Sequence, residues 1–369
     1  MNSIIVIGAG QAGLAAGYYL RQAGLPFLIL EAGAAPSGSW PAYYDSLTLF
    51  SPARYASLPG HPFPAAAETY PGRDAMAAYL RDYAAHFQLP IRTETRVARV
   101  ERAGGGFVVR GAADESFAAS AVIAASGAFA RPFIPILPGQ DVFQGRRLHS
   151  AAYQRPDDFA GARVVVVGAG NSAVQIAVEL GQRATGAGRV SLATRQPLRF
   201  QPQRILGRDI HWWLTVTGLD SYPLDRPGGG WIRRRASGAV LDTGTYQAAI
   251  AAGRPDQRPM FAGFTPNGVV WADGAAEEVD AVIFATGYQP NLDYLAGLNA
   301  LDAAGRPLHR RGMSTAVPGL AYVGLEQQRT FASATVRGAG PDAAWIVRGL
   351  QRELTRPARC CGWLPAVRP

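Results

Sequence analysis

Two glycine-rich turns have the spacing that lets a backbone bind a pyrophosphate. The first is Gly8-Ala9-Gly10-Gln11-Ala12-Gly13, which fits GxGxxG, and the second is Gly168-Ala169-Gly170-Asn171-Ser172-Ala173, which fits GxGxxA. The first glycine permits the tight bend, the second lets the phosphates approach the backbone, and the third small residue lets helix and strand pack closely. N–H groups at the helix N-terminus then face the anion. We predict that both turns bind a dinucleotide.

The residue that ends the following strand differs between the two turns. Glu31 ends the strand after the first turn, where its carboxylate can accept hydrogen bonds from two ribose hydroxyls. Arg195 holds the corresponding place after the second turn, where arginine pairs with a 2′-phosphate that a carboxylate would repel. We therefore predict FAD at the first turn and NADPH at the second, with NADH as the alternative donor. Arg199 is a second candidate for the phosphate, and a solvated surface role for Arg195 stays open.

One of the five histidines, His149, lies between the two turns in the stretch FQGRRLHSAAY, residues 143–153. Taken alone, it is a core residue, a ligand or part of a hinge between two cofactor sites. Its place between two turns of unequal cofactor preference favours the hinge. In that interpretation His149 keeps the nicotinamide in register with the flavin and does not shuttle protons.

No metal or dithiol centre is expected. His61 and His86 have no partner at metal-ligand spacing. Cys360 and Cys361 are adjacent, so there is no CxxC pair of the kind that forms a redox-active disulfide, and we interpret them as part of a terminal tail.

Each glycine turn lies in a strand–turn–helix–strand unit. The apolar runs Ile4–Ile7 and Phe27–Leu30 flank the first, and runs beginning at Arg163 and Arg189 flank the second, as expected for parallel strands buried on both faces. We predict an α/β fold with two Rossmann-like dinucleotide-binding domains, the second inserted into the first. The FAD-binding domain would comprise residues 1–153 and 286–369. The NADPH-binding domain would comprise residues 154–285, with a loop-rich insertion at about 198–242.

Further elements connect these units. The pattern predicts a long ordered loop over 34–71, a helix over 74–87, and strands over 91–100 and 107–110. A last helix is expected to start near Pro341-Asp342, because proline and acidic residues favour the first turn. Trp212 and Trp213 lie in the insertion, which would either cap the active site or pack on the domain surface.

Charge and hydropathy limit the partners. The 36 basic residues are all arginine and outnumber 27 acidic residues, giving a net charge of +9. Because the arginines are scattered, they favour anionic cofactors over nucleic acid. No run of about 20 apolar residues predicts a membrane span. The start of the chain has no signal-peptide pattern, so we expect a cytoplasmic location.

The stretch FQGRRLHSAAY fits FxGxxxHxxx(Y/F) through Phe143, Gly145, His149 and Tyr153. In this form, just before the second glycine turn, it resembles the fingerprint of flavin-containing monooxygenases, the class B flavoprotein monooxygenases. Ser39-Trp40 in SGSW resembles the family's GGxW beside FAD. Strand-end motifs at Ser126-Gly127 and Thr286-Gly287 resemble the points where the chain crosses between domains. The runs 40–64 and 324–338 are similar to small bacterial flavin monooxygenases of arsenic-resistance gene clusters.

The resemblance implies an FAD-dependent monooxygenase. NADPH and O₂ would form a hydroperoxyflavin that oxygenates a small soft nucleophile at sulfur or nitrogen, a ketone in a Baeyer–Villiger reaction, or an arsenical. One alternative is an NADPH–flavin oxidoreductase that passes electrons to a quinone or a metal without oxygen insertion. A second is a redox- or nucleotide-sensing flavoprotein. The partners would be a small-molecule substrate and O₂, and a homodimer is one option for assembly.

The candidate catalytic residues are Phe50, His149 and Asn171. The resemblance adds further candidates for cofactor binding, which are Ser39, Trp40, Val97, Ser126, Gly127, Thr286, Gly287 and Gly324. Two positions depart from related enzymes. Phe50 stands where eukaryotic-type members place an asparagine, and it cannot donate a hydrogen bond. Leu325 follows Gly324 where many two-dinucleotide flavoproteins have an aspartate.

Overall fold

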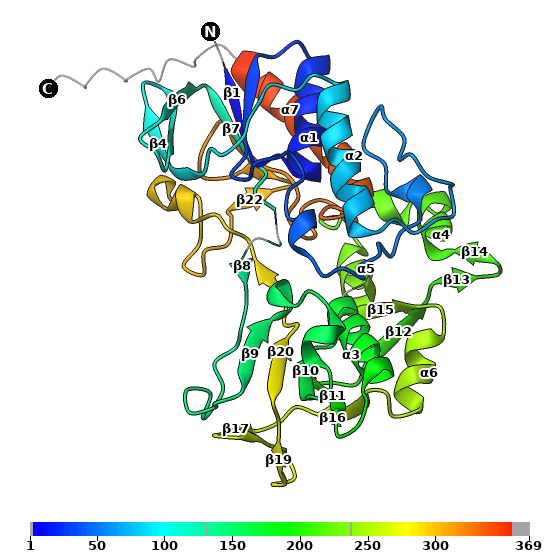
Figure 1. The fold of residues 1–369 in the computed structure, drawn as a ribbon. Helices are drawn as coiled ribbons and strands as arrows, with labels where there is room; N and C mark the ends of the chain where they lie inside the picture. Colours follow the sequence, from blue (N-terminus) through cyan, green and yellow to red (C-terminus); the bar gives the residue numbers. More distant parts are fainter. Residues whose placement is uncertain (1–2, 128, 130, 237, 356–369) are drawn as a thin grey trace, which may run out of the picture.

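Two parallel sheets, one above the other in Figure 1, organise the chain. A computed structural model describes residues 3–127, 129, 131–236 and 238–355. Cys360 and Cys361 lie outside the described residues. Helices and parallel strands alternate in both units, which confirms the predicted α/β fold class.

The first sheet combines strands from both ends of the chain. β1 (Ile4–Ile7) lies inside this sheet and pairs in parallel with β2 and β7, as the apolar run predicts. In spatial order the strands are β22 (His309–Arg310), β23 (Met313–Ser314), β24 (Leu320–Tyr322), β7 (Ala121–Ala124), β1, β2 (Phe27–Leu30) and β3 (Ile91–Arg92). Near one edge, β23 runs antiparallel to both of its neighbours, β22 and β24.

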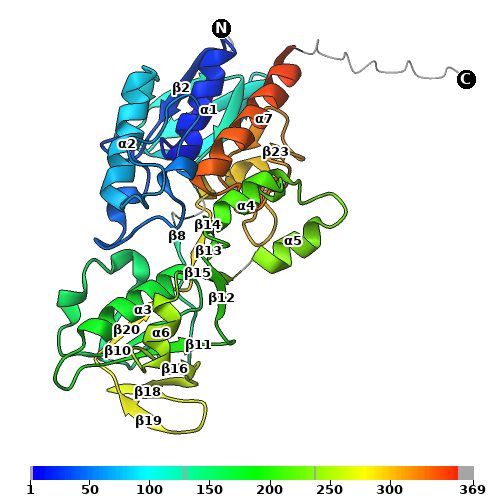
Figure 2. The ribbon, with the colours of Figure 1, turned by 90° about the vertical axis from the view of Figure 1, so that its right-hand side faces the viewer.

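Different layers cover the two faces of the first sheet. On one face, α1 (Gln11–Gln22), α2 (Arg73–His86) and α7 (Val336–Thr355) pack on the strands around a shared apolar core. Figure 2 shows these helices side by side. The other face carries a second core beneath an antiparallel sheet and a 3-10 helix. These elements are β4 (Val97–Ala103), β5 (Gly106–Gly111), β6 (Ser116–Ala119) and η6 (Asp293–Leu298).

The second sheet repeats this plan with five parallel strands. In spatial order they are β16 (Asp256–Pro259), β11 (Arg189–Thr194), β10 (Arg163–Val167), β20 (Ala281–Phe284) and β9 (Arg146–His149). On one face α3 (Asn171–Arg183) and α6 (Thr245–Ala251) enclose an apolar core. On the other face, an antiparallel meander packs beside Phe143 and Trp271. Its strands are β17 (Gly263–Thr265), β18 (Gly268–Val270) and β19 (Ala276–Glu278).

The chain passes between the two units twice, and the two passages pair with each other. β8 (Arg131–Pro132) follows the first sheet, and β21 (Tyr288–Gln289) follows the second. They are antiparallel neighbours. The sequence-based boundary at 153/154 differs from this pairing, because β9 lies in the second sheet beside β20. The passage into the second unit therefore comes before residue 146.

The insertion at 198–242 is more ordered than its composition suggests. It holds the helices α4 (Ile210–Val216) and α5 (Gly229–Ala236) and the 3-10 helix η5 (Leu219–Ser221). Its strands are β12 (Arg199–Pro202), β13 (Arg204–Ile205), β14 (Arg208–Asp209) and β15 (Ala239–Asp242). The strands are short and pair only with each other, so no long periodic pattern reveals them.

The last helix starts earlier than predicted. It begins at Val336, and Pro341 lies inside it. The expected start at Pro341-Asp342 is wrong because Asp342 does not act as a first-turn acid. Its carboxylate is fully buried and accepts a hydrogen bond from Arg329 Nε at 2.7 Å.

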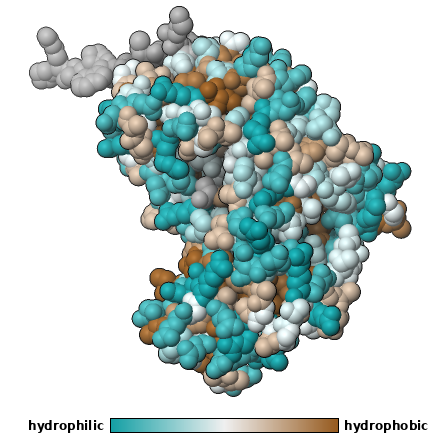
Figure 3. All heavy atoms as spheres, in the orientation of Figure 1, coloured by the Kyte–Doolittle hydropathy of each residue, from teal (hydrophilic) through white to brown (hydrophobic). Residues whose placement is uncertain are grey.

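The surface is mixed in character. On the face seen in Figure 3, hydrophilic and hydrophobic side chains are interspersed over both units. Among the residues that the structure describes, no helix has the length and apolar character needed to cross a membrane.

Candidate functional site

The first glycine turn is built so that only small residues fit. A Cβ on Gly13 would lie 1.8 Å from the carbonyl oxygen of Gly8, and Gly8 has a φ of +104°. The turn opens α1, whose first turn has no side-chain cap and no acidic residue. Glu31 lies against the turn, since its Oε2 accepts a hydrogen bond from the N–H of Ala9 at 2.6 Å. Free N–H groups beside this carboxylate fit the diphosphate and ribose of a dinucleotide.

Two other segments of the chain pack closely against the first glycine turn. A Cβ on Gly324 would lie 2.7 Å from the Ala12 Cβ, and one on Gly38 would lie 2.9 Å from the Gly10 Cα. Both glycines also have positive φ angles, which other residues rarely adopt. Gly324 therefore shapes the turn region through its lack of a side chain.

The second turn repeats the geometry at the start of α3. A Cβ on Gly168 would lie 2.4 Å from the Ala285 carbonyl oxygen, whereas one on Gly170 would have nothing within 4 Å. The first turn of α3 again has no side-chain cap and no acidic residue. The Asn171 side chain is engaged by the protein: its Oδ1 accepts a hydrogen bond from the Leu241 N–H at 3.1 Å. Asn171 thus ties α3 to β15.

A cavity of about 960 Å³ lies between the two units and receives residues from both. Of the residues singled out in the sequence, those that line it are Gln11, Ser39, Trp40, Phe50, Gly168, Gly170, Asn171, Ser172, Arg195, Thr286 and Gly287. Those that do not line it are Gly8, Gly10, Ala12, Gly13, Glu31, Val97, Ser126, Gly127, His149, Ala173 and Gly324. Most of the second group belong to the first turn and its surroundings, which lie beyond this cavity.

Arg195 is a cation without a partner among the described residues. It is exposed, lines the cavity next to Gln196, and forms no hydrogen bond or ion pair within the described part of the chain. Arg195 directly follows β11, which runs parallel to β10, and β10 leads into the second turn. An unpaired guanidinium at this position is available to an anionic group of a bound nucleotide.

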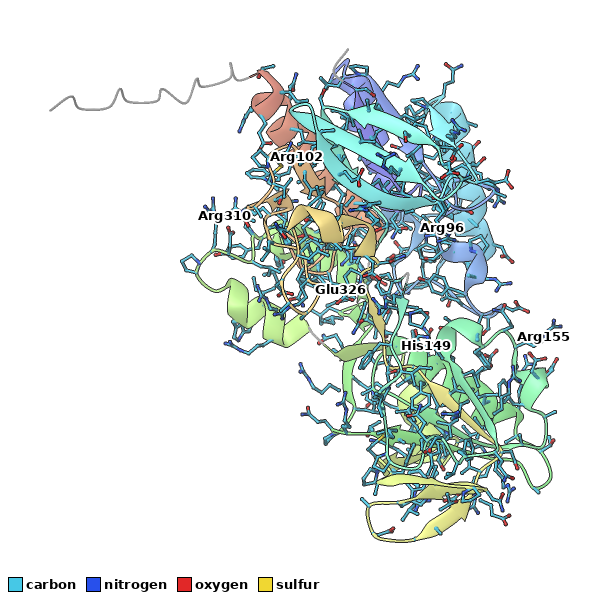
Figure 4. The ribbon with its side chains drawn as sticks, turned by 90° about the vertical axis from the view of Figure 1, so that its left-hand side faces the viewer. Arg96, Arg102, His149, Arg155, Arg310 and Glu326 are labelled. Atoms are coloured by element: carbon cyan, nitrogen blue, oxygen red, sulfur yellow. The ribbon has the colours of Figure 1, made fainter. Side chains whose placement is uncertain are left out.

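His149 is buried and has both ring nitrogens occupied by backbone groups. Nδ1 accepts a hydrogen bond from the Ala151 N–H at 3.1 Å, so Nε2 carries the proton and donates to the Gly287 carbonyl at 2.9 Å. Burial lowers the pKa of His149, although the bond to Gly287 opposes this shift. The imidazole is therefore held neutral and joins β9 to the passage after β20. Figure 4 labels His149 where the two units meet.

The other fingerprint residues are structural. A Cβ on Gly145 would lie 2.8 Å from the Asp280 carbonyl oxygen, and Phe143 packs in the core beneath the second sheet. Tyr153 is fully buried and donates a hydrogen bond to Glu179 on α3 at 2.9 Å. The motif therefore fixes the edge strand and α3 relative to each other.

Ser39 and Trp40 form one wall of the cavity. The Trp40 indole N–H donates to Gln11 Oε1 at 3.0 Å, which attaches this wall to the first turn of α1. The Ser39 and Tyr43 hydroxyls lie 3.1 Å apart. Phe50 contributes a ring that is 40% exposed, and it offers the cavity no hydrogen-bond donor from its side chain.

The strand-end motifs mainly support the passages between units. The Ser126 hydroxyl donates to the Asn291 carbonyl at 2.9 Å, and the Thr286 hydroxyl donates to the Phe133 carbonyl. Gly127 and Gly287 both have positive φ angles. Val97, at the start of β4, packs against the second core cluster.

Several cavity residues were not predicted. Tyr44 lines the cavity, and its hydroxyl donates to Gln175 on α3 at 2.5 Å. Glu326 lines it as an exposed carboxylate and is labelled in Figure 4 above His149. The start of α7 lines it through Thr335 and Val336, a helix end with no acidic residue in its first turn. Tyr44 lies in the predicted loop over 34–71, and Glu326 lies in the run 324–338, but no motif in the sequence selects these side chains.

The described residues contain no group of three or more histidine, cysteine or carboxylate side chains that could hold a metal ion. Two uncapped helix starts, each after a parallel strand, fit a protein that binds two dinucleotides, and residues from both units line one cavity between them. Residues 5–210 match the family described as "Pyridine nucleotide-disulphide oxidoreductase". The chain belongs to this family.

Proteins with similar sequences define the class of this enzyme more closely. An "Uncharacterized oxidoreductase CzcO-like" of Geobacillus kaustophilus is 33% identical over 347 residues, covering 94% of this chain and 97% of that protein. "Indole-3-pyruvate monooxygenase YUCCA4" of Oryza sativa subsp. japonica is 32% identical over 332 residues, covering 79% of this chain and 75% of that protein.

Solved structures agree. A flavin-containing monooxygenase from Stenotrophomonas maltophilia has 34% sequence identity and a TM-score of 0.82, covering 96% of this chain and all of that one. A cyclohexanone monooxygenase shares the fold at 17% identity with a TM-score of 0.67. The predicted resemblance is confirmed, and the chain is an enzyme of the flavoprotein monooxygenase group, whose cofactors are FAD and NADPH.

Proposed function

We propose that this enzyme uses NADPH and O₂ to oxygenate a small, soft nucleophile such as a thioether sulfur or an amine nitrogen. The observation that carries the proposal is the cavity between the two units, which is lined from one side by Trp40 and Phe50 and from the other by the second glycine turn and Arg195. Ketones and arsenicals are further substrates that the proposal allows. When bound, FAD supplies the redox chemistry between NADPH, O₂ and substrate.

In this proposal the first unit holds FAD. The uncapped start of α1 would hold the diphosphate, and Glu31, which lies against the turn, would accept hydrogen bonds from the ribose. Trp40 and Ser39 then lie beside the flavin ring. The FAD domain lies within the sequence-based ranges 1–153 and 286–369, except that we assign β9 and the residues after it to the NADPH unit, because β9 pairs with β20.

The second unit would hold NADPH. Gly170 leaves room for the diphosphate at the start of α3, and Arg195 pairs with the 2′-phosphate. His149 has no proton to exchange with a substrate, because both ring nitrogens bond to backbone groups. It would fix the passage at Gly287 and hence the approach of the nicotinamide to the flavin.

The cavity walls would exclude water from the reacting groups. Aromatic and apolar side chains contribute much of the lining, including Phe50, Phe129, Met260 and Phe331. Such walls suit a substrate with an apolar body and a polarisable reacting atom.

One experiment tests the proposal. The purified protein is reduced with NADPH in air-saturated buffer containing methyl phenyl sulfide, and sulfoxide, NADPH consumption and peroxide release are measured together. Sulfoxide formed in proportion to NADPH supports the proposal. Stoichiometric peroxide without any oxygenated product would instead indicate a reductase. Peroxide release is measured because the Phe50 side chain, unlike an asparagine, cannot donate a hydrogen bond into the cavity. Absence of flavin reduction by NADPH would contradict the proposed donor.

A further inference from the structure

A buried aspartate in the insertion accepts hydrogen bonds from four donors and has no part in the proposed chemistry. Asp209 is 3% exposed, at the end of β14. Its Oδ1 accepts from the His211 N–H at 2.8 Å and from His211 Nδ1 at 2.6 Å. Its Oδ2 accepts from the Tyr70 hydroxyl at 2.5 Å and from Gln203 Nε2 at 2.7 Å.

These contacts fix the protonation of the cluster. Burial alone would raise the pKa of Asp209, but the hydrogen bonds from His211, Tyr70 and Gln203 outweigh it and lower the pKa to about 2. Asp209 is therefore an anion, and His211 must carry its proton on Nδ1. Because every carboxylate oxygen is satisfied twice, the charge is tolerated in the interior.

Two of the donors also hold Phe50. Gln203 Nε2 donates its second hydrogen to the Phe50 carbonyl at 3.0 Å. The His211 ring, 1% exposed, stacks on the Phe50 ring at 6.3 Å with an interplanar angle of 18°. It also stacks on Tyr55 at 5.8 Å. Asp209 thus holds both the backbone and the ring of one cavity residue, through one intermediate side chain each.

The cluster joins segments that are far apart in sequence. Tyr70 and Phe50 belong to the loop over 34–71 of the first unit, whereas Asp209, His211 and Gln203 belong to the insertion of the second. The Phe50 ring lines the cavity, but Asp209 and His211 do not. The cluster can therefore act on a substrate only through Phe50.

We propose that Asp209 is a positioning residue that fixes Phe50 in the cavity wall through His211 and Gln203, and so sets how the enzyme holds the apolar body of an aromatic thioether or similar substrate. The inference rests on the proposed function for the kind of substrate. It does not require the Asp209–His211 pair to touch the reacting atoms. Loss of the carboxylate frees Phe50, weakens substrate positioning and admits water.

The test compares Asp209→Asn with Asp225→Asn. Asp225 lies in the same insertion and also pairs with the first unit, through Arg311 at 2.6 and 2.8 Å, so it controls for the loss of a charged tether. Tyr70→Phe is a milder variant, since it removes one hydrogen bond to Asp209 and keeps the ring. It keeps the test available if Asp209→Asn does not fold.

Two readouts separate positioning from general destabilisation. Hydrogen–deuterium exchange should rise in the peptide that contains residues 47–52 for Asp209→Asn and Tyr70→Phe, and should stay at the wild-type level there for Asp225→Asn. With methyl phenyl sulfide, the KM should rise about tenfold for Asp209→Asn, as expected for the loss of hydrogen bonds to a charged group. The ratio of peroxide to sulfoxide should rise with it, while the KM for NADPH should stay unchanged.

The exchange measurement does not depend on the reaction. Unchanged exchange over 47–52 in both cluster variants would overturn the inference, whatever the activity. If wild type forms no sulfoxide but exchange changes as expected, the positioning of Phe50 holds and the proposed substrate class fails. An equal rise in KM for the substrate and for NADPH would also overturn the inference, because it would indicate a general loss of structure.

Discussion

At the residue scale, Arg195 and His149 show how surroundings decide what a polar side chain can do. Both were selected from sequence motifs. Arg195 is exposed in the cavity with no partner among the described residues, so it is free to bind a ligand. His149 is buried, with both nitrogens bonded to backbone groups, so it supports the fold around the cavity.

Arg195→Ala should reduce the preference for NADPH over NADH. The loss of a pair between arginine and the 2′-phosphate costs about 1.5–3 kcal/mol, which corresponds to roughly a 10- to 150-fold rise in the KM for NADPH. The KM for NADH should change little. Steady-state kinetics with both nucleotides measure this, and Arg189→Ala, at the exposed start of the same strand, is the control. Equal effects on the two nucleotides would refute the assignment.

His149→Ala should impair reduction of the flavin by NADPH more than it impairs retention of FAD. The side chain holds the Gly287 carbonyl and packs edge-on against Tyr288 at 4.8 Å, so its loss loosens the passage between the units. The first glycine turn is left intact. Stopped-flow reduction rates and the flavin-to-protein ratio give the two quantities. A variant that loses FAD and keeps its reduction rate would contradict the positional role.

The lowered pKa of His149 predicts that the stability of the protein depends on pH. Burial lowers the pKa of His149 in the folded protein, so the unfolded chain takes up the proton first as the pH falls. Its stabilising contribution is present above the unfolded pKa of about 6.5 and is lost as the pH falls through the lower folded pKa. In His149→Gln the free energy of unfolding should therefore fall less between pH 7 and pH 5 than in wild type. Urea denaturation at each pH measures the slope, with the exposed His86→Gln as control, and identical slopes would count against it.

At the element scale, the two glycine turns separate residues that the fold needs from residues that a ligand needs. In the turn before α3, a Cβ on Gly168 would collide with the Ala285 carbonyl, whereas a Cβ on Gly170 would enter open space. The motif assigns the tight bend to the first glycine and the approach of the phosphates to the second, and these contacts agree with that division.

Gly170→Ala should therefore fold normally and lose nucleotide binding. The added methyl group would lie where a diphosphate must approach, so the KM for NADPH should rise at least about tenfold. The free energy of unfolding should stay within about 0.5 kcal/mol of wild type. Gly168→Ala, the matched variant, should lose about 2–4 kcal/mol of stability from backbone strain and the clash. Differential scanning calorimetry measures the stability of both variants, and steady-state kinetics measure the KM for NADPH. Equal destabilisation of the two variants would contradict the prediction.

The elements near the glycine turns could be predicted because their signals are local. The bounds of β1 and β2 follow directly from uniformly apolar runs, Ile4–Ile7 and Phe27–Leu30. The start of α7 could not be predicted in this way. Pro341-Asp342 is a good local start signal, but the helix begins five residues earlier, at Val336. Asp342 is buried against Arg329 inside the helix, a tertiary contact that the local signal does not contain.

The candidate site was also predictable only where a local sequence motif marks the residue. Motifs selected Gly170, Arg195 and Trp40, which the structure brings to one cavity. They did not select Tyr44 or Glu326, because no spacing rule marks a tyrosine or glutamate whose importance comes from an interface between units. Asn171 was predicted as a site residue, but its side chain accepts a hydrogen bond from β15, a strand that the sequence periodicity did not predict.

At the scale of the whole molecule, the insertion fastens the second unit to the first. Beyond the Asp209 cluster, Asp220 in η5 pairs with Arg337 in α7, and the Leu224 N–H donates to the Arg329 carbonyl at 2.9 Å. The predicted alternatives were a cap on the active site or a segment packed on the domain surface. The contacts place the insertion across both units beside the cavity, which Gly238 helps to line.

Because these contacts join the two units, we expect loss of the Asp220–Arg337 ion pair to lower the free energy of unfolding strongly. The Arg337 side chain is 10% exposed and donates hydrogen bonds to the Asp220 carboxylate at 3.0 and 3.1 Å. Its Nη1 is buried and has no partner among the described residues. Asp220→Asn would leave a buried guanidinium uncompensated, so the free energy of unfolding should fall by about 3 kcal/mol. Asp225→Asn breaks the more exposed pair with Arg311 and should cost about 1 kcal/mol or less. Urea denaturation of both variants measures the difference. If Asp220→Asn costs no more than Asp225→Asn, the buried pair does not hold the units together, and the insertion is fastened mainly through its contacts with the loop that carries Phe50.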